Sequence, residues 1–150
     1  MKKHMVSLVI FFSVLLSATL SAADNPQLKD QRDKANTLYA QGNYKDAYEI
    51  YSKLLLGGEQ QGIYLPDELR NALECLRRLN RMKDTDDLIE QAVAKNSTDW
   101  NFLQSAGQTL MYIDHYGTMI SGKFERGNHR GGGRYMNCQD RDRIRGLQLF

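Results

Sequence analysis

The fold of this chain is decided by the stretch Leu38-Tyr39-Ala40-Gln41-Gly42-Asn43-Tyr44-Lys45-Asp46-Ala47-Tyr48-Glu49-Ile50-Tyr51. Gly42 and Asn43 both tolerate the left-handed backbone conformation with which helices commonly end. On either side of this turn, small and apolar residues recur at three- and four-residue steps, so one face of each flanking segment is apolar. The stretch therefore predicts two helices that fold back on each other as an antiparallel hairpin.

Further helices are predicted outward from this hairpin by their caps and their apolar periods. Asn25-Pro26 is typical of a helix start, and Asn80-Arg81 is expected to form a second turn. Ser97 or Thr98 is expected to cap a fifth helix, in which Gly107 permits the close approach of another helix. The predicted helices span residues 28–41, 44–56, 66–79, 83–94 and 99–114.

These elements predict an all-α fold, with tandem antiparallel helical hairpins in residues 24–115. Residues 116–137 are rich in glycine and arginine and are expected to be irregular, with two short strands at 118–121 and 123–125 around Gly122. A last helix is predicted within 138–150, capped by Asn137; its apolar pattern runs to the final residue, so the chain is either complete or the start of a longer protein. The residues expected to pack the helices together are Ala35, Leu38, Gly42, Tyr44, Ala47, Tyr51, Leu76, Ala92 and Trp100.

The first residues carry the pattern of a secretory signal peptide at 1–22. A basic start at 2–4 precedes a nearly unbroken apolar run at 5–20, and Ser21-Ala22-Ala23 supplies the small residues of a cleavage site. Cleavage is expected after Ala22 or Ala23, with export to a periplasm or beyond and no stable membrane insertion afterwards. The alternative is an uncleaved membrane anchor.

Charge is distributed unevenly along the rest of the chain. Residues 24–115 hold 11 Lys or Arg and 15 Asp or Glu, a balance of −4, whereas residues 116–150 hold 7 and 3, a balance of +4. The two parts are therefore expected to attract each other, or the basic part to meet an acidic partner. The alternating run Asp140-Arg141-Asp142-Arg143 is interpreted as a solvated helix face. Because the exported chain is neutral, we predict no nucleic-acid partner.

Cysteines and histidines give no pattern that predicts chemistry. Cys75 and Cys138 either form one disulfide, or Cys75 is a small buried hydrophobe and Cys138 a free thiol. His115, His129 and Cys138 are 14 and 9 residues apart, without the paired spacing of a zinc site. A glycine-rich stretch is also too mobile to hold a nucleophile against its base. No catalytic residue, cofactor site or metal site is predicted.

The turns at Gly42 and Asn80 lie 38 residues apart, close to the 34-residue period of tetratricopeptide repeats. The hairpins resemble that family through Gln41-Gly42-Asn43-Tyr44 and through Ala35, Leu38, Ala47 and Tyr51. In the second hairpin Thr85 takes the position of a small residue, and Trp100 lies near the place of the family's tryptophan. The resemblance implies stacked hairpins whose concave surface binds a protein or peptide. A plain bundle of amphipathic helices is the alternative.

A second resemblance concerns the C-terminal part of the chain. Residues 122–134, from Gly122-Lys123-Phe124-Glu125-Arg126 onward, and residues 140–149 are similar to a segment near the N-terminus of large exported bacterial alpha-2-macroglobulin-like proteins. Those proteins trap proteases. The resemblance implies that this chain is a helical leader that precedes an array of β-sandwich domains.

Taken together, these patterns predict a non-enzymatic, exported module that binds a protein or peptide without a cofactor, in an oligomeric state that the sequence leaves open. The alternatives are a small structural adaptor of the cell envelope and an enzyme that uses the region of His129 and Cys138. The candidate partner-binding residues are Tyr39, Tyr48, Arg126, Arg130 and Arg134.

Overall fold

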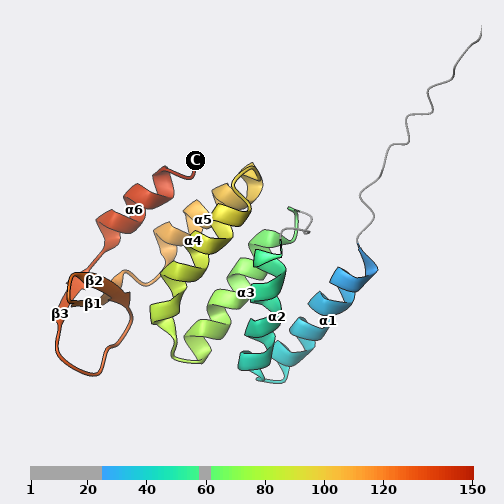
Figure 1. The fold of residues 1–150 in the computed structure, drawn as a ribbon, viewed down its shortest axis with the longest axis horizontal. Helices are drawn as coiled ribbons and strands as arrows, with labels where there is room; N and C mark the ends of the chain where they lie inside the picture. The colour runs from blue at the N-terminus through green and yellow to red at the C-terminus, as the bar shows by residue number, and fades with distance from the viewer. Residues whose placement is uncertain (1–24, 58–61) are drawn as a thin grey trace, which may run out of the picture.

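The computed structural model describes residues 25–57 and 62–150, which form mainly α-helices and one small antiparallel sheet (Figure 1). The predicted signal peptide and its cleavage site lie outside the described residues. Within the two described ranges, every helix is too short or too polar to cross a membrane. The mainly helical fold is confirmed, whereas the sheet corrects the expectation of an all-α protein.

The two predicted hairpins lie at the expected positions. The first consists of α1 and α2, and the second of α3 and α4. A 3-10 turn at Met82–Asp84 precedes α4, which therefore starts two residues later than predicted. The helices span Pro26–Ala40 (α1), Tyr44–Leu56 (α2), Leu65–Arg78 (α3), Thr85–Lys95 (α4) and Trp100–Tyr112 (α5).

The turns use the backbone conformations that their residue types favour. Gly42, with φ of 80°, follows α1, and Asn80, with φ of 55°, follows α3. Both take the left-handed conformation with which helices commonly end. The side chain of Asn25 accepts a hydrogen bond from the N–H of Gln27 at 3.0 Å, which confirms the predicted start of α1.

The predicted cap of α5 at Ser97 or Thr98 is wrong. Asp99 is the capping residue, because its carboxylate accepts a hydrogen bond from the N–H of Phe102 at 3.0 Å. A carboxylate at this position also interacts favourably with the positive end of the helix dipole, which a hydroxyl does not.

The core lies between the two hairpins and α5. Helix α3 contacts α2 and α5, and α2 contacts α4, so α3 and α5 lie on one side of the stack and α2 and α4 on the other. Leu55, Leu69 and Leu76 are fully buried, and each stabilises the fold by about 1.5–3 kcal/mol relative to an exposed side chain. Of the predicted packing residues, those buried in this core are Ala35, Ala47, Tyr51, Leu76 and Ala92, with Leu38 and Tyr44 half-buried against it.

Two predicted packing residues do not pack helices together. Trp100 is 74% exposed, because it is the first residue of α5 and points away from the core, while Phe102 takes the buried place in that turn. Gly42 is exposed, and a Cβ added there would meet no atom within 4 Å. Glycine is favoured at position 42 because the turn has a positive φ there, and not because two helices approach closely.

The segment predicted to be irregular contains a three-stranded antiparallel sheet. Its strands are β1 (Tyr116–Ile120), β2 (Lys123–Arg126) and β3 (Arg134–Asn137), in the order β2-β1-β3. The predicted hairpin of β1 and β2 around Gly122 is confirmed, because Ser121 and Gly122 both have the positive φ of a tight two-residue turn. The third strand pairs with the other edge of β1 and was not predicted.

The last helix, α6 (Gln139–Leu147), lies antiparallel to α5. The N-cap residue of α6 is Cys138 and not the predicted Asn137, but the side chain of Asn137 accepts a hydrogen bond from the N–H of Gln139, the first residue of the helix, at 2.7 Å. The two helices cross at Gly107 and Gly146, where a Cβ on either glycine would lie 2.9 Å from the carbonyl oxygen of the other. The expected close approach at Gly107 is therefore confirmed, and α5 and α6 form a third helix pair with the sheet inserted between them.

The expected attraction between the acidic and basic parts of the chain is confirmed at one interface. Asp86 and Glu90, on the face of α4 that looks toward α6, form ion pairs with arginines of the C-terminal part. Arg126 and Arg141 each lie 2.7 Å from a carboxylate oxygen of Asp86, and Arg145 lies 2.7 Å from Glu90. Opposite charges therefore hold the sheet and α6 against the second hairpin.

Candidate functional site

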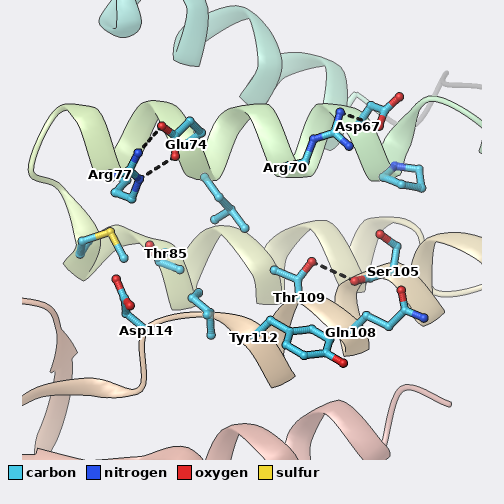
Figure 2. A pocket seen from close by; sticks show the side chains of 14 residues that line it. Asp67, Arg70, Glu74, Arg77, Thr85, Ser105, Gln108, Thr109, Tyr112 and Asp114 are labelled. Atoms are coloured by element: carbon cyan, nitrogen blue, oxygen red, sulfur yellow. Dashed lines mark hydrogen bonds and ion pairs between the residues drawn. The ribbon is translucent and has the colours of Figure 1, made fainter.

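A groove of about 560 Å³ runs between α3 and α5 (Figure 2). We call it the α3–α5 groove. One wall consists of α3 and the other of α5, and the groove is also lined by residues that follow each helix in the chain, Met82 and Asp114; Asp114 lies at one end. Its floor is apolar where Leu73 and Ile113 line it, so the groove can accept an apolar side chain as well as polar groups.

The α3 wall carries a row of charges at helical spacing. Asp67 and Arg70 form an exposed ion pair at 2.9 Å, and Glu74 accepts two hydrogen bonds from Arg77. The hydrogen bond from Arg77 is the main cause that lowers the pKa of Glu74 to about 2, so this carboxylate is ionised at any physiological pH. The row i, i+3, i+7 and i+10 places all four side chains along the groove.

The α5 wall supplies neutral hydrogen-bonding groups. The hydroxyl of Thr109 donates to the carbonyl of Ser105 at 2.9 Å, whereas the side chain of Gln108 is exposed along the groove. Tyr112 is 88% exposed, so its ring offers an apolar surface with a polar tip to any ligand. This wall can pair with amide and carbonyl groups of a bound chain.

A second depression of about 400 Å³ lies on the other side of α3, between α1 and α3. The two depressions share Asp67 and Arg70, so together they form a continuous hollow face across α1, α3 and α5. Concave surfaces with an apolar base and a few polar side chains are typical of ligand sites in proteins.

The structure does not bring the predicted partner-binding residues together. Tyr39 packs edge-on against Tyr44 at 5.5 Å, and Tyr48 lies under Arg81 at 5.1 Å; neither lines the groove. Arg130 and Arg134 are exposed in and beside the loop that leads to β3. Those two arginines therefore stay accessible but lie away from the groove.

The prediction for Arg126 is wrong, because this side chain is buried and 2% exposed as a residue. Its guanidinium donates to both oxygens of Asp142 at 2.9 and 3.0 Å, to Asp86 at 2.8 Å and to the backbone carbonyl of Asp114. We call these residues, with His115 and Cys138, the Arg126 cluster. It joins β2, α4, α6 and the end of α5.

The Arg126 cluster also overturns the interpretation of residues 140–143 as a solvated helix face. Asp142 is buried, and it accepts hydrogen bonds from Arg126 and from Arg141. The guanidinium of Arg141 also donates to Asp86. A buried carboxylate is stable only when it is paired in this way. Asp140 and Arg143 remain exposed.

Cys138 is held as a thiol. Its Sγ donates to the backbone carbonyl of His115 at 3.0 Å, and the imidazole of His115 pairs with Asp142 at 2.8 Å instead of with the sulfur. Burial and the hydrogen bond to Asp142 raise the pKa of Cys138 to about 11, which suppresses the nucleophilic thiolate at neutral pH. His129 lies near Glu125, at 3.5 Å, so the pair His129 and Cys138 is not assembled.

The disulfide alternative is wrong, because Cys75 and Cys138 are both free and buried in different places. Cys75 belongs to the helical core, as expected for a small hydrophobe, and Cys138 belongs to the Arg126 cluster. Within residues 25–57 and 62–150, no group of three His, Cys, Asp or Glu side chains has the arrangement of a metal site.

The Arg126 cluster predicts how the free energy of unfolding depends on pH. Burial alone would raise the pKa of Asp142, but hydrogen bonds from Arg126, His115 and Arg141 hold it below its ordinary value of 3.8. A carboxylate whose pKa is lower in the folded than in the unfolded state stabilises the fold at pH values above its unfolded-state pKa. This stabilisation is lost as the pH falls from the unfolded-state pKa toward the folded-state pKa. The difference in unfolding free energy between wild type and Asp142→Asn is therefore expected to shrink below about pH 4 in urea titrations. A difference that stays constant down to about pH 2 would contradict this assignment.

No family model matches this chain, and neither a characterised protein nor a solved structure is significantly similar to it. In its own geometry, the α3–α5 groove is an accessible candidate site and the Arg126 cluster is a buried one.

Proposed function

We propose that this chain is an exported protein-interaction module that holds a peptide segment of a partner protein in the α3–α5 groove. The observation that carries the proposal is the composition of the groove: an apolar floor lies between a charged wall on α3 and a hydrogen-bonding wall on α5. A peptide carries groups that match these surfaces. Its apolar side chains can cover the floor, and its backbone N–H and C=O groups can form hydrogen bonds with the α5 wall.

The arrangement of the helices supports a tetratricopeptide-like scaffold. Two hairpins stack in chain order, and α5 and α6 add a third antiparallel pair whose connection contains the sheet. In stacked hairpins the first helices of successive pairs lie side by side and shape a concave binding surface. Here α1, α3 and α5 hold those positions. Helices α3 and α5 line the α3–α5 groove, and α1 and α3 line the second depression.

Export and the wider context belong to the same proposal. The basic and apolar start of the chain supports secretion, and the C-terminal resemblance supports a role as the helical leader of an alpha-2-macroglobulin-like protein. In that role the groove would recognise a segment of a neighbouring domain or of an envelope partner.

Peptide selection tests the proposal with a matched pair of variants. A displayed library of random peptides is selected against the purified mature protein, and the enriched peptides are measured against Gln108→Arg and Gln91→Arg. Both glutamines are exposed on helices, but Gln108 lines the groove and Gln91 does not. The added bulk at Gln108 is expected to weaken binding about tenfold or more, and the change at Gln91 to leave it unaltered.

Two outcomes would overturn the proposal. One is a selection that enriches no peptide family. The other is binding that Gln108→Arg and Gln91→Arg reduce equally, since the peptides would then contact a surface other than the groove.

A further inference from the structure

One carboxylate in the α3–α5 groove has no ion pair. The two acids of the α3 wall are neutralised by Arg70 and Arg77. Among the groove residues that the structure describes, Asp114 alone is charged and without an ion-pair partner for its side chain; Arg126 contacts its backbone carbonyl. The exposed carboxylate of Asp114 therefore lies at this end of the groove without an ion pair, although the charge of Arg77 interacts with it at longer range.

A buried hydroxyl without a hydrogen-bond partner lies at the same end of the groove (Figure 2). Thr85 lines the groove and is 1% exposed, and its Oγ1 has no donor or acceptor in the described part of the chain. A buried polar group that stays unpaired destabilises a fold, so such a group usually pairs with protein, an ordered water or a ligand.

The first hairpin shows that the fold itself does not need this hydroxyl. Ala47 holds the corresponding position in α2, five residues after its turn residue Gly42, as Thr85 follows Asn80. Ala47 is fully buried and packs without any polar atom. A hairpin of this kind can therefore be packed at this position without a hydroxyl.

We infer that the Asp114 end of the groove binds an ammonium group of the peptide, supplied by a lysine side chain or by a free amino terminus. This inference rests on the proposed peptide-binding function. An ammonium group has three donors, so it can pair with the Asp114 carboxylate and also donate to the Thr85 hydroxyl. Because Thr85 is covered, the side chains around it rearrange slightly on binding. Arg77 at this end is held by two hydrogen bonds to Glu74, which also pairs with Arg78, so its guanidinium does not form an ion pair with Asp114.

The apolar floor of the groove indicates which peptide side chains lie near the ammonium group. Leu73, Met82 and Ile113 line the same groove as Asp114, so apolar side chains near the ammonium group have a surface to cover. The partner segment is therefore amphipathic, with a cationic group at one end of an apolar stretch.

The test uses the peptides selected in the displayed library, synthesised with a free or an acetylated amino terminus and with each lysine kept or replaced by glutamine. Removal of the responsible ammonium group is expected to weaken binding about tenfold, and the two peptide changes distinguish its source. The variant Asp114→Asn is expected to abolish the difference between the charged and uncharged peptides. The control Glu49→Gln removes an equally exposed carboxylate from α2, outside the groove, and is expected to preserve the difference.

Thr85→Val separates recognition from a structural defect. It keeps the shape of the side chain and removes the hydroxyl, so the free protein is expected to be as stable as wild type or more stable, while the cationic peptide binds several-fold more weakly. The inference is overturned if groove-bound peptides show no preference for an ammonium group, or if Thr85→Val leaves their affinity unchanged. In either case peptides that Gln108→Arg still blocks would leave the proposed function standing.

Discussion

Replacement of Arg126 by Met is expected to lower the free energy of unfolding by about 3–5 kcal/mol. The guanidinium is fully buried and pairs with both Asp142 and Asp86, whereas Arg141, which also pairs with both, is partly exposed. Methionine fills a similar volume but leaves Asp142 buried with fewer partners, and the loss of an ion-pair partner in low dielectric is costly. Urea unfolding of the mature protein at neutral pH, followed by circular dichroism, measures the change.

Arg145→Met is the matched control. Arg145 also joins α6 to α4 through a carboxylate, Glu90, but the side chains of this pair are 34% and 50% exposed, so solvent reaches both. Solvent screens such a pair, so the expected loss is about 0–1 kcal/mol. If Arg126→Met and Arg145→Met destabilise the protein equally, the Arg126 cluster does not hold the sheet and α6 in place.

Tyr51→Ala is expected to destabilise the fold by a similar amount, about 3–5 kcal/mol. Tyr51 is 1% exposed at the centre of the hairpin core, and its hydroxyl donates to the side chain of Asn36 on α1 at 2.7 Å. The amide of Asn71 on α3 lies 3.5 Å from the same oxygen, so this residue of α2 connects three helices. Truncation would leave a cavity where they meet. Thermal and urea unfolding of the variant measure the effect.

Two further substitutions divide this effect into its parts. Tyr51→Phe keeps the ring and removes the hydroxyl, so the expected loss is about 1 kcal/mol. Tyr112→Ala removes an exposed tyrosine from the groove wall and is expected to change stability by less than about 0.5 kcal/mol. Equal losses for Tyr51→Ala and Tyr112→Ala would mean that the first hairpin does not pack through Tyr51.

The two expected results bear on different parts of the protein. Tyr51 supports the stacked hairpins that form the α3–α5 groove, whereas Arg126 attaches the sheet and α6. Arg126 also contacts the carbonyl of Asp114, the residue at one end of the groove. The buried cluster therefore helps to position the acidic end at which we infer that an ammonium group binds.

Local patterns in the sequence predicted the helices well, because helix ends and apolar faces depend on residues that are close along the chain. Gly42, Asn80 and Pro26 mark boundaries by their own backbone preferences, and the turn at Gly122 does the same for the first two strands. The helix starting at 44 and ending at 56 agrees with the prediction for the same reason.

Long-range pairing explains what local patterns missed. Strand β3 is four residues long and mostly exposed, so it has no apolar alternation, and it forms because β1 offers a free edge. Arg126 was predicted to bind a partner; its burial depends on Asp86, forty residues earlier, and on Asp142. A signal for the groove was present in the polar rows of α3 and α5, but nothing local shows that two such rows face each other.

The amino-acid sequence by itself determined the helical hairpins, their turns and the opposite charges of the two parts of the chain, since each follows from backbone preference, apolar period or composition. Only the tertiary structure decided which charges are buried, where the inserted sheet attaches and which helix faces enclose a groove. These features arise between residues far apart in the chain, where burial and pairing are properties of the packed structure and not of any single segment.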